Sequence, residues 1–172
     1  GRKFQKKRNH VNRFRAEHSQ FELQNLTDGN FSAAQRMVGE WYRARMQADP
    51  TGDYMMESIA MSRAFRHYEG LQMESAVLVE NGEILAVTMG SRLWLDTFDI
   101  HFEKAREDVD GAYAAVNCEF ARYLRLKYPN LRYLNREDDV GLAGLRKAKL
   151  SYNPHHMVEK SWAYLAEDFH GD

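Results

Sequence analysis

The stretch L-R-Y-L-N-R-E-D-D-V-G-L-A-G-L-R-K-A-K-L-S-Y-N-P, from Leu131 to Pro154, decides the fold and carries most of the candidate chemistry. Its apolar start predicts a buried strand, which is followed by an acidic loop and by a short basic helix that begins near Gly141. Asp138 or Asp139 is expected to cap this helix, because a carboxylate accepts hydrogen bonds from the free N–H groups of a first turn. Since open α/β sheets bind ligands at the carboxyl ends of their strands, the acidic loop is a candidate site.

The short helix concentrates positive charge. Arg146, Lys147 and Lys149 lie close together on it, whereas Leu142 and Leu145 are expected to face the core. The three cations suit a phosphate, whether it belongs to a lipid, a tRNA 3′ end or a nucleotide carrier. The alternative is a solvated helix face, which needs no ligand to explain it. Both interpretations stay open at this point.

The acidic loop supplies four candidate side chains, Asn135, Arg136, Glu137 and Asp138. They could orient an amino group or a carboxylate, and arginine can clamp an anion with two parallel hydrogen bonds. We assign Asn135 and Glu137 to catalysis, and Arg136 and Asp138 to substrate binding. The alternative is helix capping with surface charge. Tyr152, further along, is a candidate general acid for a leaving group, although burial of its ring would also explain it.

A second polar group, His101, Glu103 and Lys104, is expected at or just past the end of a strand over residues 93–102. Glu103 is the candidate general base, which would take a proton from an acceptor amine or hydroxyl if burial raises its pKa toward neutrality. An ion pair with Lys104 or with an arginine is the alternative role for Glu103. His101 and Lys104 are assigned to substrate binding.

Composition bounds the class of protein. The 172 residues suit one domain, and 44% hydrophobic residues are enough for a full core. Mean hydropathy is −0.67, and no apolar run approaches the roughly 20 residues that span a bilayer. No signal peptide is visible, and the single Cys118, expected to be packed in a helix, suits a reducing cytoplasm. The adjacent His155 and His156 would point apart on a strand and lack a third ligand at metal spacing, so no metal site is expected.

The beginning of the chain is strongly basic, although the net charge of the whole chain is −1. Residues 1–16 contain no acid and seven cations, which are Arg2, Lys3, Lys6, Lys7, Arg8, Arg13 and Arg15. Such an arm could bind tRNA or anionic lipid headgroups, or it could be a solvated helix between domains. Residues 1–18 are therefore expected to form a basic connector helix, and residues 19–172 the main domain.

Hydrophobic spacing and turn residues predict an α/β fold with a mixed sheet and helices on both of its faces. Asn81-Gly82 is the clearest hairpin signal in the chain. The expected elements are a helix over 3–17, a strand over 21–26, a helix capped by Thr27-Asp28, a helix from Asp53 to Tyr68, hairpin strands over 76–79 and 84–87, a strand over 93–102, a helix over 111–128 capped by Asp110, a strand over 131–135 and a closing strand over 157–165.

Four stretches carry a family resemblance, and together they span most of the chain. They are K-R-N-H-V-N-R-F (Lys7 to Phe14), H-F-E-K-A (His101 to Ala105), N-R-E-D-D-V-G (Asn135 to Gly141) and G-L-R-K-A-K-L-S-Y-N-P (Gly144 to Pro154). With them the chain resembles the C-terminal domain of phosphatidylglycerol lysyltransferases, and in particular bacterial members known only as a domain of unknown function. The resemblance implies a GNAT-type acyltransferase fold with a splayed sheet, whose element order is the one predicted above, and often a second GNAT-like unit that precedes this one. In that fold the strands over 93–102 and 131–135 are expected to be parallel neighbours.

The same resemblance implies transfer of an aminoacyl group from tRNA to an acceptor. An acyl-CoA N-acetyltransferase is one alternative, but such enzymes generally carry a glycine-rich pyrophosphate loop. The corresponding segment here, residues 104–111, has one glycine and three acids, Glu107, Asp108 and Asp110, which would repel a pyrophosphate. No cofactor is therefore expected. A non-catalytic binding domain is the third possibility.

Overall fold

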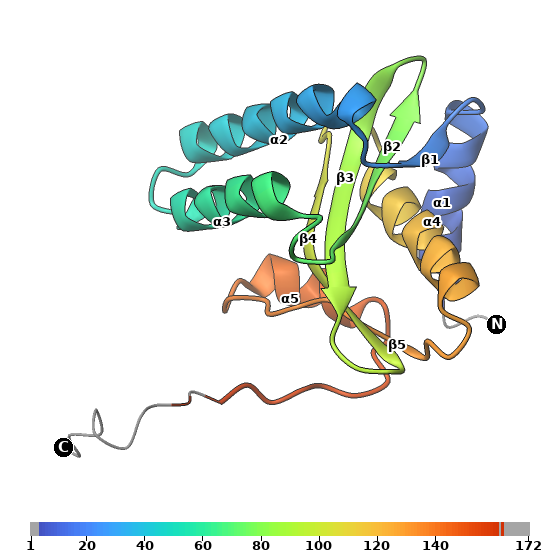
Figure 1. The fold of residues 1–172 in the computed structure, drawn as a ribbon, viewed down its shortest axis with the longest axis vertical. Coiled ribbons are helices and arrows are strands. Elements are labelled where there is room, and N and C mark those ends of the chain that lie inside the picture. The colour runs from blue at the N-terminus through green and yellow to red at the C-terminus, as the bar shows by residue number, and fades with distance from the viewer. Residues whose placement is uncertain (1–3, 162, 164–172) are drawn as a thin grey trace. The chain divides into compact units, whose positions relative to one another are not determined.

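The computed structural model describes residues 4–161 and 163. The chain divides into two compact units, and the boundary along the sequence falls between Asp138 and Asp139. The first unit holds the sheet and most of the helices (Figure 1). Its elements are α1 (Gln5–Glu17), β1 (Glu22–Asn25), α2 (Asp28–Ala48), α3 (Tyr54–His67), β2 (Glu74–Glu80), β3 (Glu83–Arg92), β4 (Thr97–Ala105), α4 (Ala112–Lys127) and β5 (Tyr133–Asn135). The second unit contains α5 (Ala143–Leu150).

The sheet is mixed, with its five strands in the order β1-β2-β3-β4-β5. The first four strands pair antiparallel, and the predicted turn joins β2 to β3 with Asn81 and Gly82 at φ 50° and 82°. Strand β5 pairs parallel to β4, with Thr97 opposite Tyr133 and Asp99 opposite Asn135. A parallel neighbour requires a crossover, which α4 provides. The prediction that the segments 93–102 and 131–135 are parallel neighbours is confirmed.

Helices cover both faces of the sheet, as the alternating pattern predicts. Helices α2 and α3 lie on one face, and α1 and α4 lie on the other (Figure 1). Val77 and Val87 pack in the core under α2 and α3, whereas Leu78 and Ala86 pack in the core under α1 and α4. Phe14 of α1 is fully buried in this second core. Helix α1 is therefore part of the first unit, and its role as a connector to another domain stays a prediction.

Strand β4 contains a bulge at His101. Met89 of β3 pairs with Phe102, and the next residue, Gly90, pairs with Ile100. His101 is therefore an extra residue of β4 that has no partner of its own on β3. A bulge re-aims side chains and reverses the alternation of faces. Gly90 is required beside it, because a Cβ atom there would lie 2.2 Å from the carbonyl oxygen of Asp99. This local irregularity determines which face each polar residue of β4 occupies.

The boundaries of β4 and β5 differ from those expected. Strand β4 ends at Ala105, so Glu103 and Lys104 lie inside the strand rather than at or past its end. Ladder pairing with β3 continues to that point and extends the strand beyond the predicted residue 102. Strand β5 is half-buried instead of buried, because it is the edge strand of the sheet. Residues 157–161 and 163 form no strand, and the rest of the predicted closing strand lies outside the described residues.

The predicted helix starts also need correction. Helix α5 begins at Ala143, with Leu142 as an N-cap residue that makes no side-chain cap. Leu142 and Leu145 are 54% and 38% exposed, so the expectation that they face the core was wrong. An amphipathic spacing marks a face that can be buried, but burial needs a covering surface as well. Helix α4 starts after Gly111 in the left-handed region without a side-chain cap, and Asp110 instead forms an ion pair with Arg13.

No helix among the described residues combines the length and the apolar character that crossing a membrane requires.

Candidate functional site

Glu103 is held in a buried ion pair on the α1 and α4 side of the sheet. Its side chain is 8% exposed, and its Oε1 accepts a hydrogen bond of 2.5 Å from the Arg136 guanidinium. Its Oε2 accepts a second one of 3.1 Å from the amide of Asn117 on α4. The carboxylate is thus oriented through both oxygens. Arg136 follows β5 directly, so the pair links the two parallel strands where β5 ends.

Lys7 of α1 completes this group, which we call the Glu103 cluster: Glu103, Arg136, Asn117 and Lys7. Burial and the nearby Arg136 cation lower the pKa of the Lys7 ammonium, whereas the Glu103 carboxylate acts in the opposite direction. A lysine with a lowered pKa gives up its proton more easily than an exposed one. The cluster therefore combines a carboxylate held through both oxygens, a guanidinium that can bind an anion through two bonds, and a partly buried lysine, and these groups come from four different segments.

A second polar group, the His101 triad, consists of Asp99, His101 and Glu137. The His101 Nδ1 atom lies 3.5 Å from Glu137 Oε1 and 3.8 Å from Asp99 Oδ2. Its Nε2 atom lies 2.8 Å from the Ser91 hydroxyl on β3. Asp99 is almost fully buried, and Glu137 is about one third exposed. The predicted residues His101 and Glu137 are thus brought together, and Asp99 joins them unpredicted.

Lys104 lies on the opposite face of the sheet from Glu103, because successive strand residues alternate. Its Nζ atom is 2.8 Å from Glu57 of α3 and lies 4.1 Å from the centre of the Trp41 ring. Burial lowers the pKa of Lys104, and the Glu57 carboxylate opposes that effect. The structure therefore separates Lys104 from Glu103, and a buried ion pair with cation–π contact accounts for its position.

The remaining predicted site residues lie mainly in the second unit. Arg146 Nε and Nη2 donate to Asp139 at 2.5 and 3.2 Å, and this bond lowers the pKa of Asp139. Asp139 also accepts a hydrogen bond from the backbone N–H of Gly141. The structure describes the two units separately, so the substrate-binding role of Arg146 stays a prediction. The same holds for four further residues, namely the exposed Asp138 and Lys147 and the half-buried Lys149 and Tyr152.

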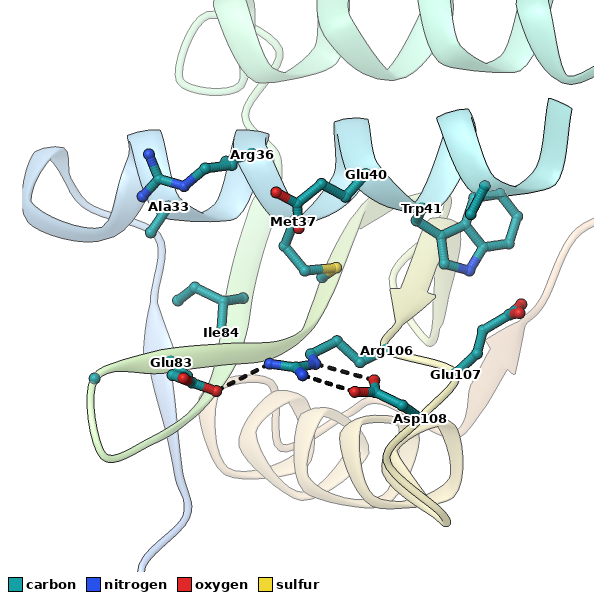
Figure 2. Close-up of a pocket in the computed structure, with 12 residues that line it drawn as sticks. Ala33, Arg36, Met37, Glu40, Trp41, Glu83, Ile84, Arg106, Glu107 and Asp108 are labelled. Carbon is teal, nitrogen blue, oxygen red and sulfur yellow. Dashed lines mark hydrogen bonds and ion pairs between the residues drawn. The ribbon is translucent and has the colours of Figure 1, made fainter. Parts of the chain in front are cut away.

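A cavity of about 560 Å³ lies elsewhere in the first unit, between α2, the β2–β3 hairpin and the segment after β4 (Figure 2). None of the predicted site residues lines it. Trp41, Met37 and Ile84 supply its apolar wall. Its charged residues are Arg36, Arg106, Glu40, Glu83, Glu107 and Asp108, so acids outnumber bases. Such a pocket disfavours a polyanion such as a pyrophosphate.

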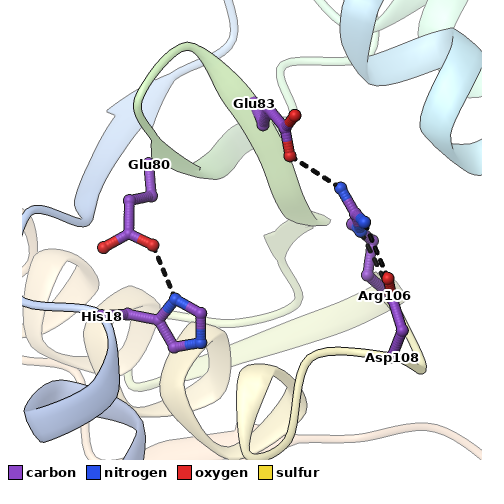
Figure 3. A network of polar contacts seen from close by, with 5 residues as sticks. All are labelled: His18, Glu80, Glu83, Arg106 and Asp108. Carbon is purple, nitrogen blue, oxygen red and sulfur yellow. Dashed lines mark hydrogen bonds and ion pairs between the residues drawn. The ribbon is translucent and has the colours of Figure 1, made fainter.

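Ion pairs stiffen the rim of this cavity. Arg106 donates to Glu83 at 2.9 Å and to Asp108 at 2.7 Å, which links the hairpin to the segment after β4 (Figure 3). On the other side of the hairpin, His18 Nδ1 lies 2.6 Å from Glu80 (Figure 3). The guanidinium of Arg106 is therefore already occupied by two carboxylates.

Helix α1 covers the N-terminus of α4. A Cβ atom on Gly111 would lie 3.0 Å from the carbonyl oxygen of His10 and 3.1 Å from the Cβ atom of Phe14. The start of α4 follows the strand whose loop would hold a pyrophosphate in a CoA-dependent acetyltransferase. Backbone N–H groups at a helix start bind phosphate only when the ligand can approach them. Here His10 and Phe14 of α1 lie against Gly111 and narrow the space beside the start of α4.

Comparison with known families identifies the chain. The family model "Phosphatidylglycerol lysyltransferase, C-terminal" matches residues 1–164. The chain belongs to this family. The resemblance carried by the four quoted motifs is thereby confirmed. A comparison with curated proteins finds no match.

Comparison with solved structures shows which fold this chain has. A conserved protein of unknown function from Bacteroides thetaiotaomicron VPI-5482 is 39% identical, with a TM-score of 0.83 over 91% of this chain. The chain spans only 52% of that protein. A possible acetyltransferase from Clostridium difficile 630 (9% identity, TM-score 0.59, 85% of this chain and 97% of that one) is also similar. A ribosomal-protein-alanine N-acetyltransferase from Brucella melitensis biovar Abortus 2308 is similar as well, with 10% identity and a TM-score of 0.56 over 84% of this chain and 98% of that one. This chain thus has the predicted GNAT-like fold.

Several members of the two polar groups were missed in the sequence. Asn117 lies on the inward stripe of α4, four residues after Tyr113 and three before Phe120, and a polar residue on such a stripe was an available signal. Lys7 stands in the first matched motif, but it was counted only as part of the basic arm. Ser91 and Asp99 face each other across β3 and β4, and only the register of the sheet reveals that.

Proposed function

We propose that this domain is an acyltransferase that moves an aminoacyl or acyl group from a large donor to an amine or hydroxyl acceptor, with the Glu103 cluster at its centre. The observation that carries the proposal is the buried Glu103–Arg136 pair, fixed by Asn117 at the point where β4 and β5 part. Membership of the lysyltransferase family supports an aminoacyl group as the one transferred.

The cluster suggests a division of roles. The acceptor oxygen or nitrogen would attack the ester carbonyl carbon of the donor while its proton passes to the Glu103 carboxylate. The bond between the carbonyl carbon and the leaving oxygen would then break, and Tyr152 stays the candidate that protonates this oxygen. Arg136 is partly exposed and could hold a negative charge on the donor or the acceptor, since a guanidinium binds carboxylate and phosphate through two bonds.

Aminoacyl-tRNA is the donor that the basic arm favours, although part of the arm is engaged within the domain. Arg13 pairs with Asp110 and Arg15 pairs with Glu119, whereas Lys6 is exposed. The cations of α5, Arg146 among them, would add to an RNA surface if they face the same ligand. Binding through phosphates should weaken steeply with salt. We also propose a preceding GNAT-like domain, in line with the resemblance, and a cytoplasmic setting, in line with the single Cys118.

Acyl-CoA is disfavoured as the donor by two observations. Helix α1 packs against Gly111 at the N-terminus of α4, and the cavity beside the segment after β4 is lined by more acids than bases. We therefore expect that CoA does not bind with a micromolar dissociation constant, which would correspond to a binding free energy of about 8 kcal/mol. Isothermal titration calorimetry measures this directly, and a dissociation constant near 1 μM would contradict the argument.

A transfer assay tests the proposal as a whole. The protein is incubated with tRNA that carries labelled lysine and with vesicles containing phosphatidylglycerol, and in parallel with labelled acetyl-CoA and free amines. We expect label on the lipid, and Glu103→Gln should slow its appearance by about 100-fold or more, the range of general-base catalysis. Glu119→Gln is the matched control, because Glu119 is also partly buried and paired with arginines, Arg15 and Arg122, outside the cluster.

Two outcomes would contradict this proposal. Equal rates for Glu103→Gln and Glu119→Gln would remove Glu103 from the chemistry. A folded wild-type protein that accelerates none of these transfers would instead support a non-catalytic binding domain.

A further inference from the structure

The His101 triad has the geometry of a metal site. One ligand atom from each of Asp99, His101 and Glu137 lies within 4.8 Å of the other two. In a tetrahedral zinc site, metal–ligand bonds of about 2.0–2.2 Å place neighbouring ligand atoms about 3.3–3.6 Å apart. The observed separations from His101 Nδ1, 3.5 Å to Glu137 and 3.8 Å to Asp99, are close to that range. They are also longer than hydrogen bonds.

Ser91 orients the imidazole for this role. The hydroxyl lies 2.8 Å from His101 Nε2, on the side of the ring away from the two carboxylates. If Nε2 carries the proton and donates to Ser91, Nδ1 presents its lone pair to Asp99 and Glu137. Histidines that bind metals generally donate their other ring nitrogen to an oxygen acceptor in this way, which fixes the tautomer. Ser91 therefore occupies the position of an outer-sphere partner.

The backbone places these side chains with unusual local features. His101 is the bulged residue of β4, and it lies on the same side as Asp99 because residues two apart in a strand share a face. Glu137 has a φ of 54°, which is uncommon for a residue other than glycine and often marks functional sites. Asp99 is 7% exposed, so its carboxylate charge sits beside little water. A buried carboxylate of this kind is stabilised by a cation.

We propose that Asp99, His101 and Glu137 bind one divalent transition-metal ion, with zinc as the best fit. One imidazole nitrogen among the ligands favours transition ions over magnesium or calcium, which prefer all-oxygen sites. Three protein ligands leave a fourth position for water or for a ligand oxygen, as in catalytic rather than structural zinc sites. The site is separate from the Glu103 cluster, and its occupancy is measurable without any transfer activity.

The sequence expectation of no metal rested on His155 and His156, and these two residues supply the control. Their side chains are exposed, and neighbouring histidines can bind zinc weakly without a built site. A variant with His155→Ala and His156→Ala should keep the proposed site intact. Retention of binding in this variant would show that the zinc is held elsewhere than on the adjacent pair.

The test is titration of the chelator-treated protein with zinc chloride, followed by calorimetry, and with cobalt chloride, followed by visible absorption. We expect one equivalent of zinc with a dissociation constant of about 1 μM or lower. We also expect a cobalt spectrum of low coordination number. His101→Ala and Glu137→Gln should weaken zinc binding by about 100-fold or more, and Ser91→Ala by about 10-fold to 100-fold. The double variant of His155 and His156 should bind within about 2-fold of wild type.

Circular dichroism of each metal-free variant shows whether it has folded. If His101→Ala does not fold, the variants at Glu137 and Ser91 decide, because Glu137 lies outside the strands and Ser91→Ala removes only a hydroxyl. Two results overturn the proposal. One is a folded wild-type protein that takes up less than one equivalent of either ion, and the other is binding that survives Glu137→Gln but disappears with His155 and His156.

Discussion

Removal of Arg136 should destabilise this domain more than neutralisation of its partner Glu103. In Arg136→Ala, the carboxylate of Glu103, which is 8% exposed within the pair, loses its charged partner. In Glu103→Gln, the amide keeps the volume and can still accept the hydrogen bond from Asn117, and the remaining guanidinium is 27% exposed and reaches water. The two single changes therefore leave charges with very different access to solvent.

The magnitude follows from that difference. Breaking a fully buried ion pair on one side costs about 3–5 kcal/mol. Arg136 is partly exposed, and the nearby Lys7 still attracts the Glu103 carboxylate, so we expect about 2–3 kcal/mol for Arg136→Ala. For Glu103→Gln we expect about 1 kcal/mol. At about 2–4 °C per kcal/mol for a chain of this size, Arg136→Ala should melt about 4–12 °C lower.

Urea unfolding of both single variants and the double variant measures the coupling between the two residues. The double variant should cost less than the sum of the single ones by about 1–2 kcal/mol, since it no longer buries an unpaired charge. Equal losses in the two single variants, or strict additivity in the double variant, would refute this account of the pair. If Glu103→Gln alone lost several kcal/mol, Glu103 would be a structural ion-pair member, and its assignment as general base would fail.

Two further predictions concern the bulge and the hairpin. Gly90→Ala should lose about 1–3 kcal/mol of unfolding free energy in urea, because its Cβ would collide with the Asp99 carbonyl, whereas Gly39→Ala, in open space on α2, should gain up to about 1 kcal/mol. A tolerated Gly90→Ala would contradict the observed close approach. The His18 ring holds the pKa of Glu80 below its usual range, so this carboxylate stabilises the fold above its unfolded pKa and loses that effect as pH falls. Between about pH 5 and 3, the unfolding free energy of Glu80→Gln should fall less than that of wild type. If the two plots of unfolding free energy against pH ran parallel, Glu80 would have no such stabilising role.

Local signals in the sequence were sufficient for most of the elements. Asn81-Gly82 predicted the hairpin, because both residues readily take a positive φ. Apolar spacing predicted helices α1 to α4, and the element order together with the family motifs predicted the parallel pairing of the segments around β4 and β5. The family motifs pointed to His101, Glu103, Arg136 and Glu137, which the structure brings into two neighbouring groups. These signals depend on residues that are near one another in the chain.

The pairing inside those groups was decided only by the tertiary structure. Glu103 meets Arg136 and Asn117 across three segments, and no spacing in the chain encodes that contact. Lys104 was expected near Glu103, but strand alternation sends it to Glu57 on the other face. The bulge at His101 shifts the alternation along β4, and it depends on the close approach of Gly90 to Asp99. Sequence patterns report which residues can be buried or charged, whereas strand register, a long-range property, determines which of them meet.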